Sequence, residues 1–485
     1  MAHRVTAAIP VVVLAFTAIS FAPRVHAGEE AESGRPTLFG HPVNVPAELT
    51  EAEVEARAQA FHEGLERQGQ VLKGNQVLPK SALEPYYRDE THPVAAWDKP
   101  PHRTSIFLNF FGGKLKNGTN ASESESPCVQ GGTIDYPGYT SGEQAALAII
   151  QVFKDAAEPF GMRILYEDFP PKHLPYSQVM MGGRPSVLGL PNGVLGVACN
   201  LDCGDSWWRD TTFAFTEGVN DIPTLGTTAL QEAAHAWGLD HIDGANNIMY
   251  PYATPGIKVW ADTCTKYNAA TGGIGCQPTH DQFCSGGAQN DVAELTAYFG
   301  PNSVDSEPPT VKMLEPKDGQ MYTKGDTLHI EVEVNDNFLG YGWRLMVPEL
   351  GQEQPVYNGQ TIWDLPVPPM GKYTIRVEAI DHDANIGFAE AKIYVDTVPS
   401  EGGDSSGDSG ETPTTGDEAS ASAGDSDSGA SAGGSQSGSE GSSSDTSDEV
   451  SDKDEGCSCR SEVPASAPGW LLGLLGALLI RRRRG

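Results

Sequence analysis

Two different spacings of apolar residues divide the middle of the chain. Between about residues 103 and 304, short apolar runs alternate with stretches in which apolar side chains recur every three or four positions. The first pattern is typical of buried strands and the second of helices. The run 106–111 ends at two glycines and predicts a first strand, and a helix is expected over 141–157. Further strands are predicted at 162–166, 178–181 and 194–198.

Beyond about residue 310 the pattern changes to an alternation of apolar and polar residues. This period of two predicts half-buried strands, at 311–313, 328–334, 373–379 and 391–395. The segment 305–397 is therefore expected to be a β-sandwich, and it resembles the immunoglobulin-like modules appended to bacterial surface enzymes. Asp336, Asp381 and Asp383 lie in its turns and could bind calcium, or could simply be acidic turn residues.

The two ends of the chain differ from this folded middle. Residues 1–27 have a basic start, an apolar stretch and a small-residue cleavage motif, which is the pattern of a secretory signal peptide. Residues 398–456 are rich in Ser, Gly, Asp and Glu, so they are expected to form a disordered acidic linker. The net charge of −33 argues against nucleic acid as a partner, because a polyanion would be repelled.

The region between the signal peptide and the first strand, residues 28–102, contains one expected helix. Thr50 and Glu53 have the spacing of a capping box, and apolar residues follow at helical spacing from position 54 to 65. This region is either a pro-segment that covers a cleft or only an N-terminal extension.

One short segment contains residue types that bind metal ions. A helix is expected to end at Gly238, which can take positive φ, and it places Gln231 and His235 one turn apart on the same face. Glu232 lies beside them, and the chain beyond the helix brings His241 to the same point. Two imidazoles and a carboxylate that converge in this way suit a zinc ion with an activated water.

The segment resembles the signature of the metzincin metallopeptidases, H-E-x-x-H-x-x-G-x-x-H followed by a Met-turn. Met249 is placed as the Met-turn residue, and four residues match the signature position by position: Glu232, His235, Gly238 and His241. The resemblance is to the matrixin branch and implies an α+β fold over 103–304, a twisted mixed sheet with an active-site helix. The first histidine of the signature is Gln231 here, and its carbonyl oxygen is a weaker zinc ligand than an imidazole.

The resemblance implies a zinc-dependent endopeptidase that acts on a protein or peptide. Zinc would be held by His235 and His241, and more weakly by Gln231. Glu232 would be the general base, and Tyr252 is a candidate for stabilising the oxyanion. The alternative is a catalytically inactive metzincin-shaped module that binds through its cleft, which the glutamine at position 231 favours. A structural adhesion protein of the cell surface is a third interpretation.

Other residues could complete such a zinc site. His173 and His280 are candidates, although exposed loop positions are expected for both. Asp240 and Asp243 flank His241 and could be outer carboxylates or a ligand.

Matrixins are typically kept latent by a pro-segment cysteine that ligates the zinc. No cysteine precedes Cys128, so this chain lacks that device. His92 or Asp98 could block the zinc instead, although surface roles are expected for both.

The eight cysteines fall into two groups. Six lie between residues 128 and 284, and they predict up to three disulfides of open connectivity in an exported domain. The Cys199 and Cys203 pair could also be half of a metal site. Residues 457–485 combine two cysteines, a short apolar run and terminal arginines. They resemble the myxobacterial C-terminal sorting segment (MYXO-CTERM), which implies display on the cell surface. Membrane contact is expected only through this segment, and the chain is expected to be a monomer.

Overall fold

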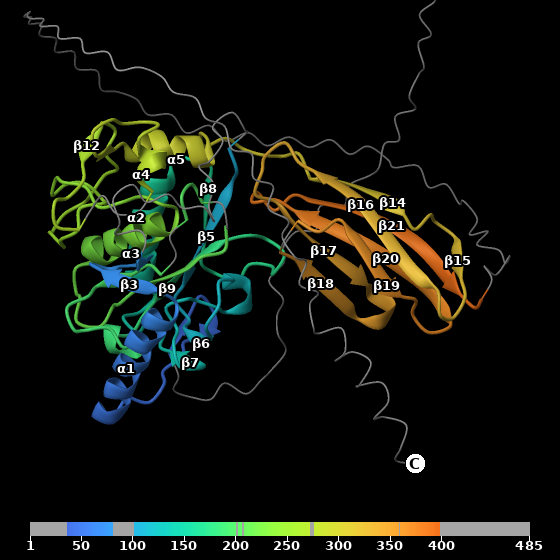
Figure 1. Ribbon diagram of the computed structural model, residues 1–485, viewed down its shortest axis with the longest axis horizontal. Coiled ribbons are helices and arrows are strands. Elements are labelled where there is room, and N and C mark those ends of the chain that lie inside the picture. Colours follow the sequence, from blue (N-terminus) through green and yellow to red (C-terminus); the bar gives the residue numbers. More distant parts are fainter. Residues whose placement is uncertain are drawn as a thin grey trace, which may run out of the picture. The chain divides into compact units, whose positions relative to one another are not determined.

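The computed structural model describes six stretches of the chain (Figure 1). They are residues 36–80, 101–199, 202–205, 208–271, 276–357 and 359–397. Several expectations concern segments outside the described residues: the signal peptide, the acidic linker, the sorting segment, His92 and Asp98. Within the six stretches, no helix is both long enough and apolar enough to cross a membrane.

The first half of the described chain is built on a five-stranded mixed sheet with the strand order β10–β11–β9–β5–β8. Four strands run parallel, and β10 at the edge is antiparallel to β11. The strands are β5 (Thr104–Asn109), β8 (Met162–Leu165), β9 (Ser177–Met181), β10 (Gly196–Val197) and β11 (Thr211–Ala214). The first three strands confirm their predictions to within two residues. The strand expected at 194–198 is shorter, and β11 matches no predicted strand.

Two helices pack on this sheet and on each other, α2 (Glu143–Ala157) and α3 (Ile222–Ala236). Both were expected from the sequence. Helix α2 buries one apolar face that includes Ile150 and Phe153, as predicted, whereas Leu147, also expected to be buried, is exposed. Helix α3 contacts β9 and β11 and is buried along most of its length, so its residues 231, 232 and 235 lie inside the fold.

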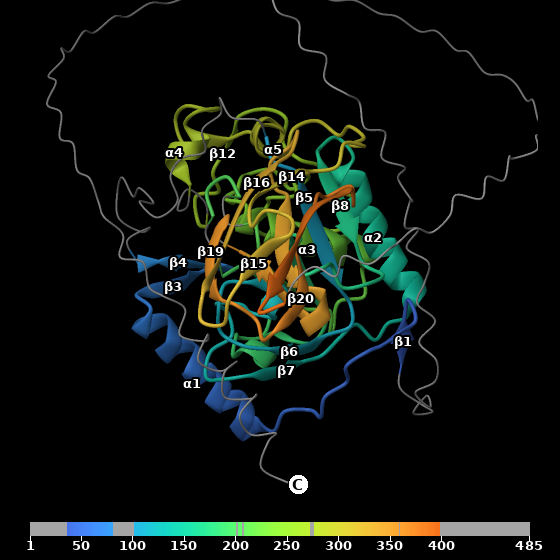
Figure 2. The same ribbon diagram turned by 90° about the vertical axis from the view of Figure 1, so that its right-hand side faces the viewer.

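The region before the sheet forms a helix followed by a hairpin, as Figure 2 shows. Helix α1 (Glu51–Arg67) begins with the predicted capping box, since Thr50 and Glu53 bond reciprocally. Strands β3 (Gln70–Lys73) and β4 (Gln76–Pro79) then pair across a two-residue turn. The helix and the hairpin share an apolar cluster with the edge of the sheet, whose members include Phe61, Leu65, Val77, Val197 and Phe213.

The cysteine-rich region closes the first half of the chain. Three disulfides confirm the expected number and join Cys128 to Cys199, Cys203 to Cys276 and Cys264 to Cys284. Cys199 and Cys203 therefore belong to different disulfides.

The smaller elements of this half of the chain are β1 (Thr37–Leu38), β2 (His41–Pro42), β6 (Gly113–Leu115), β7 (Ile134–Tyr136), β12 (Thr265–Lys266), α4 (Gln277–His280), β13 (Ala288–Gln289) and α5 (Asp291–Phe299).

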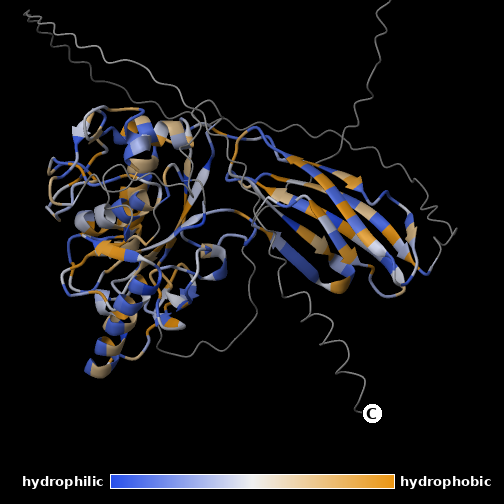
Figure 3. Ribbon diagram, in the orientation of Figure 1, coloured by the Kyte–Doolittle hydropathy of each residue, from blue (hydrophilic) through white to orange (hydrophobic). Residues whose placement is uncertain are grey.

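Residues from about 310 to 395 form two sheets around one apolar core. One sheet contains β14 (Thr310–Glu315), β16 (Thr327–Asn335) and β19 (Ile362–Pro366). The other contains β15 (Gln320–Tyr322), β21 (Ile386–Val395), β20 (Gly371–Ile380), β17 (Gly342–Val347) and β18 (Gln352–Val356). The alternating colours along these strands in Figure 3 show the predicted period of two. The four predicted strands are confirmed as parts of β14, β16, β20 and β21.

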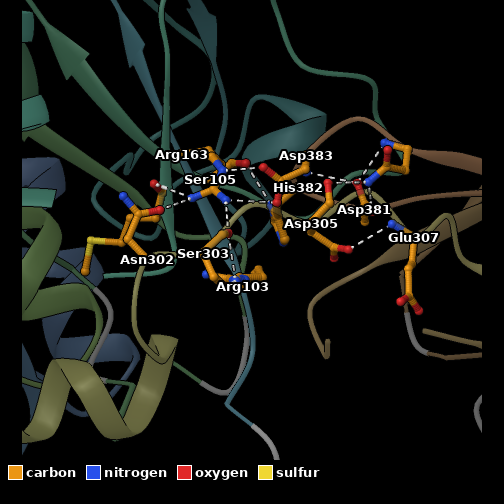
Figure 4. Close-up of polar contacts among 12 residues, drawn as sticks. Arg103, Ser105, Arg163, Asn302, Ser303, Asp305, Glu307, Asp381, His382 and Asp383 are labelled. Carbon is orange, nitrogen blue, oxygen red and sulfur yellow. Dashed lines mark hydrogen bonds and ion pairs between the residues drawn. The ribbon is translucent and has the colours of Figure 1, made fainter. Parts of the chain in front are cut away.

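The turn between β20 and β21 contacts the mixed sheet through polar side chains (Figure 4). Asp383 accepts two hydrogen bonds from the guanidinium of Arg163, at 2.7 and 2.9 Å. His382 is buried, and its Nε2 donates to the carbonyl of Gly340 at 2.9 Å. Its Nδ1 therefore accepts from the hydroxyl of Ser105 at 2.7 Å. Burial lowers the pKa of His382 to about 3, so the imidazole is neutral in the folded state at neutral pH.

His382 makes folding sensitive to acid. Above pH 6.5 the side chain is neutral in both states, and below that pH only the unfolded chain takes up the proton until the pH approaches 3. Stability should therefore fall as the pH drops from 6.5 to 4.5. The fall should be about 2 kcal/mol larger in the wild type than in His382→Gln, which keeps one donor and one acceptor. Urea unfolding at both pH values measures this difference, with the exposed His62→Gln as control. Equal falls in all three proteins would contradict the expectation.

Candidate functional site

Helix α3 carries the predicted site residues, and hydrogen bonds fix both of its ends. Its N-cap is Asp221, whose carboxylate accepts from the backbone N–H of Thr224 at 3.0 Å. Gln231, Glu232 and His235 lie in its last two turns, and all three are buried.

The end of α3 turns the chain back toward its own last turn. The N–H of Gly238 donates to the carbonyl of His235, and the N–H of Leu239 donates to that of Ala234. This pair of bonds is a Schellman motif, with Gly238 at the residue of positive φ, +105°. The turn delivers His241, as predicted, so that its Nε2 lies 3.0 Å from the Nε2 of His235.

The two imidazoles face each other through their Nε2 atoms. The Nδ1 of His235 donates to the carbonyl of Leu239 at 2.8 Å, so its Nε2 carries a lone pair directed at His241. Burial lowers the pKa of His235 well below its usual range. Burial also lowers the pKa of His241, although Asp240 and a backbone hydrogen bond with Thr271 act in the opposite direction. Both rings are therefore neutral, which is the form that binds metals.

Glu232 lies three residues before His235 on the same helix. It is fully buried, and burial raises its pKa well above the usual range. Its Oε1 accepts from the side-chain amide of Asn75 at 2.5 Å, while its Oε2 is buried without a hydrogen bond. Gly196 leaves room for it, because a Cβ at that position would lie 2.5 Å from the Glu232 Cγ. The edge strand β10 thus passes directly over the carboxylate.

Gln231 faces the turn around Met249 with its amide nitrogen. This nitrogen donates to the carbonyls of Ile248 and Tyr250, at 2.8 and 2.9 Å. Met249, between them, is completely buried. The amide nitrogen of Gln231 therefore anchors this turn, and only its oxygen remains to act as a ligand.

The other sequence candidates lie in different surroundings. Tyr252 is half exposed, and its ring packs against that of Tyr250, 5.5 Å between centroids. The expectation of exposed loop positions is wrong for His173 and His280, since both are buried. His280 is bonded to Glu294 at 2.7 Å, and this carboxylate raises its pKa against the effect of burial. Neither histidine is bonded to the imidazole pair.

Two residues of the site were missed by the sequence analysis, Asn75 and Gln76 at the tip of the β3–β4 hairpin. Besides the contact of Asn75 with Glu232, the amide nitrogen of Gln76 lies 2.6 Å from Nδ1 and 3.4 Å from Nε2 of His235. Gly74 opens the turn with φ +64°. The Gly-Asn pair between two apolar dipeptides is a hairpin signal that could have predicted the turn. This sequence signal does not predict which part of the fold the hairpin contacts.

Two further groups of acids have carboxylate oxygens within 4.8 Å of one another and could hold a cation. They are Asp202, Asp205 and Asp210, and Asp305, Asp336 and Asp381, the second partly visible in Figure 4. The turn acid Asp383, expected beside Asp336 and Asp381, pairs with Arg163 instead. Among the described residues, neither group includes a residue of the 231–241 motif.

Neither a family model nor a curated protein matches this chain. Among solved structures, it is similar to the fibronectin(III)-like modules of CbhA from Clostridium thermocellum, at 22% identity and a TM-score of 0.16, covering 18% of this chain and 46% of that one. An endo-beta-1,4-mannanase from Thermotoga petrophila is similar at 14% identity and a TM-score of 0.15, over 45% of this chain and 47% of that one. This chain thus spans less than half of either structure, and similarities of this size support no inference about function.

Proposed function

We propose that the chain is an exported zinc-dependent endopeptidase with a metzincin-like catalytic region. The observation that carries this proposal is a pair of buried imidazoles whose Nε2 atoms, of His235 and His241, lie 3.0 Å apart, with the buried carboxylate of Glu232 three residues before His235 on the same helix. Two neutral imidazoles with facing nitrogens repel each other unless a cation or a proton lies between them. Residues that fold this way in a buried site therefore suit a metal.

The residues present fit zinc in their donor types. Two nitrogens bound to one tetrahedral zinc at about 2.0–2.1 Å lie roughly 3.3 Å apart, close to the separation of the two Nε2 atoms. The Nδ1 of His235 is held by a backbone carbonyl, as is usual for a metal-binding histidine. A third donor from the chain would be the amide oxygen of Gln231, which lies one helical turn before His235 in α3.

Each residue then has a definite task in peptide hydrolysis. Zinc, when bound, supplies Lewis acidity toward a water and the scissile carbonyl. Glu232 takes a proton from the attacking water and returns it to the leaving amine. Burial raises the pKa of Glu232, which favours the protonated carboxyl that returns the proton to the leaving amine. The edge strand β10 lies over Glu232 and can pair with the backbone of an extended substrate.

Metal content of the whole secreted chain tests the zinc site. About one zinc per chain is expected by elemental analysis after dialysis against a weak chelator. His235→Ala should lose at least nine tenths of it, because it removes one of two imidazoles. His62→Ala, an exposed histidine of α1, is the control and should retain the metal. Equal metal content in all three proteins would contradict the assignment.

A specific observation favours a second function, that of a binding module without catalysis. The amide of Gln231 is committed through its nitrogen to two Met-turn carbonyls, so the position that holds an imidazole in the metzincin signature here stabilises a loop. A folded chain that binds no zinc and cleaves no labelled casein would support this alternative.

We propose a supporting role for the two-sheet region, as an immunoglobulin-like spacer between the catalytic region and the acidic linker. The three disulfides are consistent with an extracellular location. Display on the outer surface would follow from the sorting segment.

A further inference from the structure

The tip of the β3–β4 hairpin occupies the cleft in the manner of a bound peptide. The N–H of Val77 donates to the carbonyl of Ala198 at 2.9 Å, and the N–H of Ala198 donates to the carbonyl of Asn75 at 3.1 Å. Gln76 thereby forms a parallel bridge with Ala198, the residue after β10. These bonds are main-chain bonds to the edge of a sheet, which is how sheets recognise extended polypeptides.

The side chains at the tip cover the reactive groups. Asn75 bonds to one carboxylate oxygen of Glu232, and Gln76 lies against His235, as described above. The turn also passes close to the second imidazole, since a Cβ at Gly74 would lie 3.7 Å from Cε1 of His241. A water or a substrate carbonyl cannot approach these three groups while the tip is in place.

Apolar packing holds the hairpin in the cleft. Val77 and Leu78 are each only 1% exposed, and Phe61 and Leu65 of α1 join the same cluster. Burying each such side chain contributes roughly 1.5–3 kcal/mol. The hairpin therefore stays in place without a cysteine that binds the metal.

We infer that residues 50–80 are a built-in inhibitor, in which the hairpin tip takes the place of an extended peptide substrate and blocks Glu232 and the imidazole pair. This inference rests on the proposed function for the identity of the site. In this proposal the region 28–102 contains a segment that covers the candidate site and is more than an N-terminal extension. It also assigns the blocking contacts to Asn75 and Gln76.

The experiment compares three forms of the full-length chain loaded with Co²⁺, a spectroscopic substitute for zinc. They are the wild type, Asn75→Ala/Gln76→Ala, and a control, Gln59→Ala/Gln68→Ala, which changes two exposed residues of the same segment. The first measurement is the affinity of acetohydroxamate for the bound metal, monitored through the visible absorption of Co²⁺. The second is the cleavage of fluorescein-labelled casein.

The double variant at the tip should bind acetohydroxamate at least tenfold more tightly than the wild type and the control, and should cleave casein at least tenfold faster. Tighter binding without cleavage would support the inhibitor and contradict the peptidase. Equal binding by all three proteins would overturn the inhibitor, whether or not they cleave casein. A folded chain that binds no Co²⁺ would overturn both proposals.

Discussion

Glu232→Gln is expected to lower kcat/KM for peptide cleavage by about 10²–10⁴-fold in the Asn75→Ala/Gln76→Ala background. Glutamine has the shape of glutamate but cannot take a proton from the attacking water or return it to the amine. The side chain is completely buried under Gly196, where a Cβ would already lie 2.5 Å from it, so a replacement of the same size is needed to leave the cleft undisturbed. Hydrolysis of labelled casein measures the loss.

Two comparisons separate a catalytic role of Glu232 from a structural one. Zinc content and the urea midpoint of Glu232→Gln should stay close to those of the parent, because neither the imidazole pair nor the apolar core is changed. Glu333→Gln, an exposed carboxylate of β16, should leave the cleavage rate unchanged. If Glu232→Gln cleaved casein at the parental rate, the proposed mechanism would be wrong.

Much of the candidate site could be predicted because its residues are close in sequence. A helix places residues one turn apart on one face, and glycine permits the positive φ that brings His241 back, so the spacing alone predicted the imidazole pair. The contacts of Asn75 with Glu232 and of Gln76 with His235 could not be predicted in the same way. They join residues more than 150 positions apart, at separations of 157 and 159.

The same distinction applies to the fold. Strands with a continuous apolar run or a clean alternation were predicted, as β5 and β16 show. Strand β11 was missed because Thr-Thr-Phe-Ala is short and carries no clear period, although every residue of it is buried by its neighbours in the sheet. His280 was expected on the surface since histidine is usually at least partly exposed. Its burial depends on Glu294, a partner that only the folded chain supplies.

Gly238→Ala is expected to have the largest effect on stability among single changes at the motif. Alanine at φ +105° costs roughly 1–2 kcal/mol, since L-residues avoid left-handed conformations. The added Cβ would also lie 2.8 Å from the carbonyl oxygen of Asp202 and 3.0 Å from Sγ of Cys276. Overpacking of this kind adds about 1–3 kcal/mol. A total loss of roughly 3 kcal/mol is therefore expected, measured by urea unfolding.

Gly193→Ala provides a control that separates the two causes. Gly193 has a similar φ, +93°, but a Cβ there would have no atom within 4 Å, so its loss should be only about 1–2 kcal/mol. The zinc affinity should also fall more in Gly238→Ala than in Gly193→Ala. Gly238→Ala shifts the turn that brings His241 to His235, whereas Gly193→Ala leaves that turn unchanged. Equal losses of stability and of zinc affinity in the two variants would show that close packing around Gly238 does not position the imidazole pair.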